Sequence, residues 1–106
     1  MADLEFVQGD TAPDLVATLH EDGDASAPIN LTGCTVVFQM RKPDDKRYTV
    51  NRSATIEDAV NGVVRYEWGA NDLAIPGTYQ GQFEVTYSDS KIQTTKDTFS
   101  IEVRRQ

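Results

Sequence analysis

The fold of this chain is decided by the stretch Asn61-Gly62-Val63-Val64-Arg65-Tyr66-Glu67-Trp68. An Asn-Gly pair in front of a strand is the strongest short hairpin signal, because both residues tolerate the positive φ that a tight turn needs. The residues after it alternate, with Val64, Tyr66 and Trp68 on one side and Val63, Arg65 and Glu67 on the other. Alternation with period two is typical of a strand with one buried face. We therefore expect a strand from Val63 that pairs with the segment ending near Ile56.

The same alternation recurs along almost the whole chain. The apolar sides of the other expected strands carry Leu4, Phe6 and Val7; Leu15, Ala17 and Leu19; Val36, Phe38 and Met40; Tyr48, Val50, Ala54 and Ile56; Tyr79, Phe83, Val85 and Tyr87; and Phe99, Ile101 and Val103. About seven short strands at this spacing predict an all-β fold, an immunoglobulin-like antiparallel β-sandwich.

Two of these strands carry finer predictions. The polar segment Tyr48–Ile56 indicates an edge strand, or a strand with an irregularity near Arg52. The last two strands are expected to form the closing hairpin, because Asp89-Ser90 supplies turn residues between them. Helical spacing holds only over 71–75, where Pro76-Gly77 ends it, so no full helix is expected.

A corner motif supports the sandwich. Immunoglobulin-like folds often open the penultimate strand with a tyrosine whose hydroxyl binds backbone a few residues upstream. The segment Asp72-Leu73-Ala74-Ile75-Pro76-Gly77-Thr78-Tyr79 has a short corner, a turn and a tyrosine in that order. Tyr79 is therefore the expected corner tyrosine.

Length and charge limit the possible functions. The 106 residues contain no interdomain linker, so residues 1–106 are expected to form a single domain. A formal net charge of −7 repels phosphate backbones and anionic lipids, so neither nucleic acid nor a membrane is an expected partner. One cysteine excludes an internal disulfide, and the N-terminal residues lack a signal-peptide pattern. We expect a soluble protein that matures in a cytoplasm.

Catalytic chemistry has few candidates. His20 is the only histidine, and its position in the alternation turns it toward solvent without a partner to orient it. Cys34 has no positive charge beside it in the sequence and is expected to be a small residue entering a core strand. We predict no catalytic and no cofactor-binding residue.

One acidic segment is a candidate for metal binding, and one tryptophan is a candidate for sugar binding. Glu21, Asp22 and Asp24 around Gly23 have part of a calcium-loop pattern but lack the remaining oxygen ligands, so a solvated acidic turn is favoured and no metal is predicted. The Asp44-Asp45 pair indicates a turn. Trp68 could stack on a sugar if exposed, but its register with Val64 and Tyr66 favours the core.

Four blocks of sequence carry a family resemblance. They are Phe6-Val7-Gln8-Gly9-Asp10-Thr11-Ala12-Pro13 followed by Leu15; Pro28-Ile29-Asn30-Leu31-Thr32-Gly33-Cys34-Thr35-Val36-Val37-Phe38-Gln39-Met40-Arg41; Gly62-Val63-Val64-Arg65-Tyr66-Glu67-Trp68; and Asp72–Tyr79. In this order the chain resembles the immunoglobulin-like N-terminal domain of phage baseplate upper proteins. Members often continue into a connecting region, whereas this sequence ends at Gln106 after its last expected strand, and Asp89-Ser90 stands where a Gly-containing turn is more usual.

The resemblance implies a structural function without catalysis. It predicts a non-enzymatic structural protein of a tailed-phage virion, in the tail or baseplate, that is assembled in the host cytoplasm and docks onto other virion proteins. Capsid decoration, a carbohydrate-binding host-attachment module and a small hydrolase remain open as alternatives. We also expect a homo-oligomer or a symmetric array on the particle, with the edge near Arg52 and the terminal strand as candidate contacts.

Overall fold

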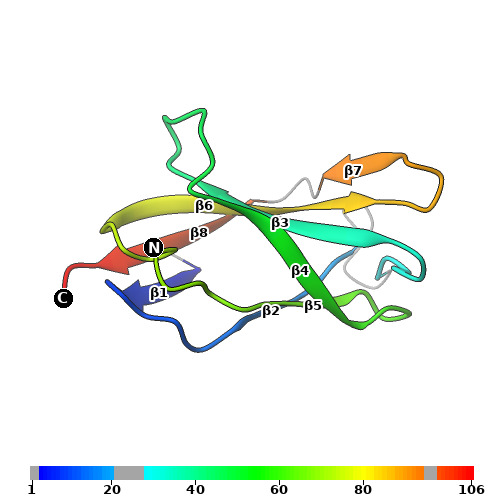
Figure 1. The fold of residues 1–106 in the computed structure, drawn as a ribbon, viewed down its shortest axis with the longest axis horizontal. Helices are drawn as coiled ribbons and strands as arrows, with labels where there is room; N and C mark the ends of the chain where they lie inside the picture. The colour runs from blue at the N-terminus through cyan, green and yellow to red at the C-terminus, as the bar shows by residue number, and fades with distance from the viewer. Residues whose placement is uncertain (1–2, 21–27, 95–97) are drawn as a thin grey trace.

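The computed structural model describes residues 3–20, 28–94 and 98–106, and these contain eight strands (Figure 1). The strands are β1 Leu4–Val7, β2 Leu15–Thr18, β3 Thr35–Arg41, β4 Val50–Asp58, β5 Val63–Tyr66, β6 Gly77–Thr86, β7 Ile92–Thr94 and β8 Phe99–Arg104. None of the described residues is helical, and residues 70–73 form a turn. The prediction of an all-β fold is confirmed.

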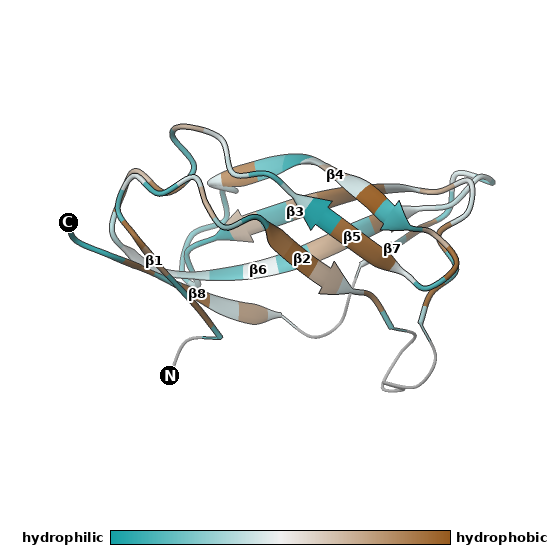
Figure 2. Ribbon diagram, turned by 90° about the horizontal axis from the view of Figure 1, so that it is seen from below, coloured by the Kyte–Doolittle hydropathy of each residue, from teal (hydrophilic) through white to brown (hydrophobic). Residues whose placement is uncertain are grey.

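The strands form one curled sheet in the order β1-β8-β6-β3-β4-β5-β2, with β7 also beside β6. The sheet curls at β4, because residues 50–54 pair with β3 and residues 55–58 pair with β5. We call β1, β8, β6, β7, β3 and residues 50–54 the large layer, and residues 55–58, β5 and β2 the small layer. Figure 2 shows β2 and β5 lying across β3 and β6. The β1–β8 pair is parallel, whereas the other pairings among the described strands are antiparallel.

The core lies between the layers and is centred on Phe38. Its side chain has no exposed surface, and its ring centroid lies 4.8 Å from that of Tyr66, 5.4 Å from Phe83 and 5.5 Å from Trp68. Tilted and edge-on aromatic contacts at these distances add to the free energy gained by burying the rings. The predicted apolar faces supply most of this core, so the alternation is confirmed there. It is wrong for Val7 and Tyr48, which are each 41% exposed.

The hairpin at Asn61-Gly62 forms as predicted. Ile56 faces Val64 and Asp58 faces Val63, with a bulge between Ile56 and Asp58. The Asp58 carboxylate accepts hydrogen bonds from the backbone and side-chain amides of Asn61. An irregularity was predicted near Arg52, but it lies between Ile56 and Asp58 instead. At Arg52 itself β4 pairs with β3 in regular register. As predicted, residues 50–54 form an edge, since β3 is their one partner among the described strands.

The closing hairpin contains a strand that the sequence did not reveal. β6 pairs with β8 as predicted, but the turn at Asp89-Ser90 leads first into the three-residue β7. Glu84 faces Thr94, and Gly81 faces Phe99. Between these two pairs the sequence advances by three residues on β6 and by five on the chain that returns along it. β7 was missed because Ile92-Gln93-Thr94 is too short to show alternation.

Gly62→Ala should lower the free energy of unfolding by about 2–4 kcal/mol, because a methyl group adds a clash to the strain of positive φ. Gly62 has a φ of 71°, and its added Cβ would lie 2.8 Å from the carbonyl oxygens of both Leu19 and Ile29. Gly9→Ala is the matched control, since Gly9 has a φ of 90° and open space around it. It should cost only about 1 kcal/mol. Urea denaturation of both variants measures the difference, and equal costs would contradict the clash.

Candidate docking surface

Alternation along the large layer turns one row of side chains away from the core. The uncharged members of this outer face are Thr35, Val37, Gln39, Asn51, Ser53, Thr78, Gln80, Gln82, Thr86 and Ser100. Charged side chains lie around the Gln39–Gln82 pair, with Arg41 at one end of the β3–β6 pair, Glu84 opposite Val37, and Glu102 and Arg104 on β8. The outer face of the large layer therefore has an uncharged centre at Gln39 and Gln82 with charged side chains around it.

Side-chain amides join three strands in the middle of this face. Gln82 Nε2 donates to Gln39 Oε1 at 2.8 Å, and Gln39 Nε2 donates to Asn51 Oδ1 at 3.4 Å. Gln82 Nε2 also lies 3.4 Å from the Tyr48 hydroxyl. Gln39 is only 6% exposed although it points outward. This amide ladder fixes the side chains of β4, β3 and β6 in one arrangement.

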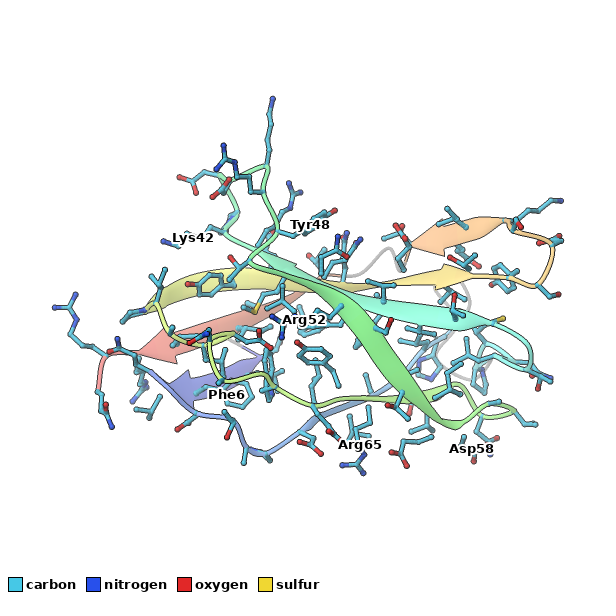
Figure 3. All side chains as sticks on the ribbon, viewed as in Figure 1. Phe6, Lys42, Tyr48, Arg52, Asp58 and Arg65 are labelled. Atoms are coloured by element: carbon cyan, nitrogen blue, oxygen red, sulfur yellow. The ribbon has the colours of Figure 1, made fainter. Side chains whose placement is uncertain are left out.

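A hairpin between β3 and β4, residues 42–49, stands on the same side. Figure 3 shows it projecting away from the small layer, with Lys42 and Tyr48 at its base. The Thr49 N–H donates to the Met40 carbonyl at 2.7 Å, which closes the base of the hairpin. Tyr48 is 41% exposed beside the amide ladder. Ile92, opposite Thr86, and Val7, opposite Arg104, are exposed apolar side chains on this face.

This composition suits protein contact. The central part of a protein interface is depleted of charged residues and enriched in aromatic ones, whereas its rim is polar and solvated. The outer face of the large layer has this arrangement, and its amides can donate and accept hydrogen bonds. The ladder was not predicted, because the alternation marks Gln39 and Gln82 only as outward residues, whereas the register of β3 on β6 sets them side by side.

A buried carboxylate holds the corner between the layers. Asp72 is 4% exposed, and its Oδ2 accepts hydrogen bonds from the Tyr66 hydroxyl at 2.5 Å and the Gly69 N–H at 2.7 Å. Its Oδ1 lies 3.4 Å from Nη1 of Arg52 on β4. Burial, followed by the hydrogen bond and charge of Asp72, raises the pKa of Tyr66. This network was not predicted, since its members come from three separate segments of the chain.

Tyr79 forms the predicted corner. Its hydroxyl donates to the Ile75 carbonyl at 2.6 Å, and the side chain is 1% exposed. Burial raises its pKa. The Lys42 ammonium lies 5.9 Å from the Tyr79 ring centroid, within the range of a cation–π contact. The corner is thereby joined to the base of the hairpin.

The residues considered for catalysis or sugar binding do not form a common site. His20 is exposed, as predicted, and forms an isolated bridge with Pro28. Cys34 is a free thiol packed against the core. Trp68 is 5% exposed, which confirms its core position and removes it as a sugar-stacking platform. Its indole N–H has no hydrogen-bond acceptor among the described residues.

The acidic positions are only partly described. Glu21, Asp22 and Asp24 lie outside the described residues. The Asp44-Asp45 pair is in a turn, as predicted, since the Asp45 N–H donates to the Lys42 carbonyl at 3.0 Å. Within residues 3–20, 28–94 and 98–106, no three histidine, cysteine or acidic side chains gather in a group that could hold a metal ion.

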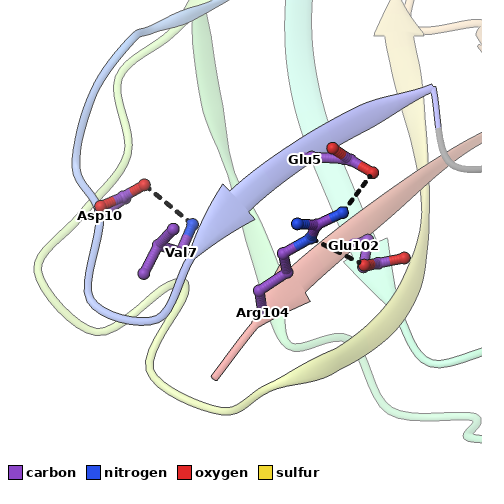
Figure 4. Close-up of polar contacts among 5 residues, drawn as sticks. All are labelled: Glu5, Val7, Asp10, Glu102 and Arg104. Atoms are coloured by element: carbon purple, nitrogen blue, oxygen red, sulfur yellow. Dashed lines mark hydrogen bonds and ion pairs between the residues drawn. The ribbon is translucent and has the colours of Figure 1, made fainter. Parts of the chain in front are cut away.

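One of the two predicted contact edges is occupied, and the other is open. The terminal strand β8 lies between β6 and β1, so it is not a free edge. Arg104 on β8 pairs with Glu5 and Glu102 at 3.3 Å, and the Asp10 carboxylate accepts the Val7 N–H at 2.9 Å (Figure 4). On β4 the Arg52 side chain turns to Asp72. The prediction of the terminal strand as a contact edge is therefore wrong. Residues 50–54 are an open edge, blunted by the inward-turned charge of Arg52, and contact there stays a prediction.

Comparison with known proteins identifies the family. A family described as the BppU N-terminal domain, the N-terminal domain of baseplate upper proteins, matches residues 2–106. The chain belongs to this family. It is therefore a structural component of the phage tail baseplate, located in the virion. The resemblance seen in the four sequence blocks is confirmed.

Solved structures support the fold of this baseplate domain. The N-terminal domain of phage TP901-1 ORF48 is 23% identical with a TM-score of 0.72, and the match covers 95% of this chain and 83% of that chain. CopC from Methylosinus trichosporium OB3b is 11% identical with a TM-score of 0.53, and the match covers 100% of this chain and 87% of that one. No curated protein sequence matches the chain. No helix of the described residues is long and apolar enough to cross a membrane.

Tyr79→Phe should lower the free energy of unfolding by about 1–2 kcal/mol, because the hydrogen bond from the buried Tyr79 side chain to the Ile75 carbonyl is lost. Tyr87→Phe is the matched control, since its hydroxyl bond to Gln93 is exposed. The control should change the free energy of unfolding by less than about 0.5 kcal/mol. Urea denaturation measures both, and an unchanged midpoint for Tyr79→Phe would remove the corner role.

Stability should fall as the pH rises above the ordinary tyrosine pKa of 10.0. Tyr66 and Tyr79 have raised pKa values in the fold, so over this range they keep protons that the unfolded chain has released. The unfolded state is then favoured by each further increase in pH. Urea midpoints measured from about pH 9 to about pH 11 should show the decline. If the urea midpoint of Tyr66→Phe falls with pH as steeply as that of the wild type, Tyr66 does not contribute to the decline.

Proposed function

We propose that this domain is a non-enzymatic docking module of the baseplate, and that it binds a neighbouring virion protein through the outer face of the large layer. The observation that carries this proposal is the amide ladder of Gln39, Gln82 and Asn51. It presents ordered, uncharged donors and acceptors beside the exposed Tyr48 ring. Side chains that are already fixed lose less conformational freedom on binding.

The partner surface would match this face in two respects. Its centre would be uncharged and hydrogen-bonding, since a charge facing the amide ladder would lose water without gaining an ion-pair partner. Its margins would carry charges complementary to Arg41, Glu84 and Glu102. The apolar side chains of Val7 and Ile92 would add contact at opposite ends of the face.

We further infer that residues 1–106 form a single immunoglobulin-like domain. An immunoglobulin constant-type sandwich places its second, fifth and fourth strands in one sheet and its third, sixth and seventh in the other. The present order has β2, β5 and the second half of β4 in the small layer, and β3, β6 and β8 in the large one. The Tyr79 corner and one shared core cluster support the same assignment.

The remaining expectations are proposals of the same kind. Assembly in the host cytoplasm, a homo-oligomer or symmetric array, and the lack of a catalytic site, cofactor, nucleic acid or membrane partner all accord with a particle component. Capsid decoration and carbohydrate binding are less favoured, because the family is a baseplate family and Trp68 is buried.

Gln82→Arg should weaken binding of the purified domain to tails of the parent phage by at least about tenfold, because it places a charge in the middle of the docking face. Val60→Arg is the control, since Val60 is 64% exposed in the β4–β5 turn, outside that face. Co-sedimentation with tails and with empty capsids measures binding. Equal binding by Gln82→Arg and wild type would exclude this face, and pelleting with capsids alone would favour decoration.

A glycan array separates the docking module from the host-attachment alternative. Under the docking proposal, wild-type protein should bind no glycan. Specific glycan binding that Tyr48→Ala abolishes would replace docking by sugar recognition, because Tyr48 is the exposed aromatic side chain of this face.

A further inference from the structure

The hairpin segment Arg41–Tyr48 has the opposite charge to the whole chain. It contains four of the ten lysine and arginine residues and two of the 17 acidic ones. Its net charge is therefore +2, against −7 for the chain. The cations are Arg41, Lys42, Lys46 and Arg47, and we call this segment the basic hairpin.

Two of these cations are available for a partner. Three of the four described arginines outside the hairpin, Arg52, Arg65 and Arg104, each lie within 3.4 Å of a carboxylate of the same chain. The fourth, Arg105, makes no ion pair with a described residue. Lys46 and Arg47 are exposed and make no ion pair with any residue in the described part of the chain. Their charge is not compensated by a fixed intramolecular contact.

The basic hairpin is held in one shape by its own contacts. The Arg47 N–H donates to Asp45 Oδ1 at 2.9 Å, and Arg41 Nη1 donates to the Asp45 carbonyl at 3.4 Å. The Lys42 side chain is placed over the Tyr79 ring. The segment thus needs little ordering to bind, which reduces the entropy lost on association.

An acidic surface lies on the small layer. Asp14 and Glu57 pair with Arg65 at 3.0 and 2.7 Å, and Glu67, just after β5, is exposed without an ion pair among the described residues. Two carboxylates thus share one cation, and a third follows that cation by two residues in the sequence. We call Asp14, Glu57 and Glu67 the acidic face.

The two surfaces point in opposite directions. Figure 3 shows Lys42 and Tyr48 at the hairpin on one side of the molecule, and Arg65 and Asp58 on the other side. A single copy cannot bring its basic hairpin to its own acidic face, but two copies can bring these surfaces together.

We propose that the basic hairpin of one copy docks onto the acidic face of a second copy of this chain. The contact joins two different surfaces, so it is head-to-tail and leaves one of each surface free for the next copy. Such a contact closes into a ring or continues as a row. It is separate from docking onto another virion protein, and it is tested on the purified chain alone.

The contact between one pair of copies is weak, because exposed ion pairs contribute little and are screened by salt. Repetition around a particle multiplies weak contacts without any new interaction. The free chain should therefore associate reversibly and in a concentration-dependent manner.

Sedimentation velocity of the full chain tests the charge dependence. The weight-average sedimentation coefficient should rise with protein concentration at about 0.01 M salt, where the screening length is about 30 Å. The rise should disappear at about 1 M salt, where that length is about 3 Å. A strict monomer under both conditions, or association that salt leaves unchanged or strengthens, would overturn the proposal.

Charge-reversal variants test the two surfaces. Lys46→Glu/Arg47→Glu should weaken self-association by at least about tenfold, since it replaces attraction by repulsion. Lys91→Glu/Arg105→Glu is the matched control, because it makes the same change of charge at exposed positions outside both surfaces. Circular dichroism confirms that each variant is folded.

Mixing two variants tests the head-to-tail geometry. Glu57→Lys/Glu67→Lys keeps the basic hairpin, and Lys46→Glu/Arg47→Glu keeps the acidic face. Each variant alone should be monomeric, whereas their mixture should associate in alternating order, because each surface of one variant is opposite in charge to the other surface of its partner. Association of Glu57→Lys/Glu67→Lys with itself as strong as wild type would overturn the acidic face as the acceptor, and failure of the mixture to associate would overturn the pairing of the two surfaces.

Discussion

The change of layer within β4 is the constraint on which the remaining structure depends. β4 pairs with β3 over its first half and with β5 over its second, so each half has a hydrogen-bonded partner strand in a different layer. The two layers are therefore joined by a continuous strand as well as by core packing. The bulge between Ile56 and Asp58 follows the change, as expected where a strand bends between sheets.

The Arg52–Asp72–Tyr66 network stabilises this bend from the inside. The chain passes between the layers within β4 and again in the connection from β5 to β6. Asp72 lies in that connection and contacts Arg52 on β4, so it links the two passages. A buried carboxylate is stable only when its oxygen atoms have partners, and here a phenol, a backbone amide and a guanidinium supply them. The same arrangement turns Arg52 inward and keeps the open edge of β4 from pairing with another chain.

The sequence predicted the features that depend on neighbouring residues. Period-two alternation located the buried faces, the Asn61-Gly62 pair located a hairpin, and the segment before Tyr79 located the corner. These signals are local, because backbone geometry ties them to positions one, two or four residues apart.

The missed features depend on register between distant strands. Gln39, Asn51 and Gln82 each appear only as outward polar residues until β3 is aligned with β4 and β6. Asp72 appeared to be a turn residue, although it is buried against Arg52 and Tyr66. The parallel β1–β8 pair covers the terminal strand, and no local pattern shows which edge the N-terminal segment chooses.

The location of the candidate surfaces follows from the same topology. The connection from β3 to β4 leaves the large layer before β4 bends, so the hairpin at 42–49 projects on the side away from the small layer. The second half of β4 then carries Glu57 to the opposite side, beside Arg65. A single strand thus has the basic hairpin at its start and part of the acidic face at its end. The separation of charge is a consequence of the layer change, so the constraint that closes the core also gives the molecule two different ends.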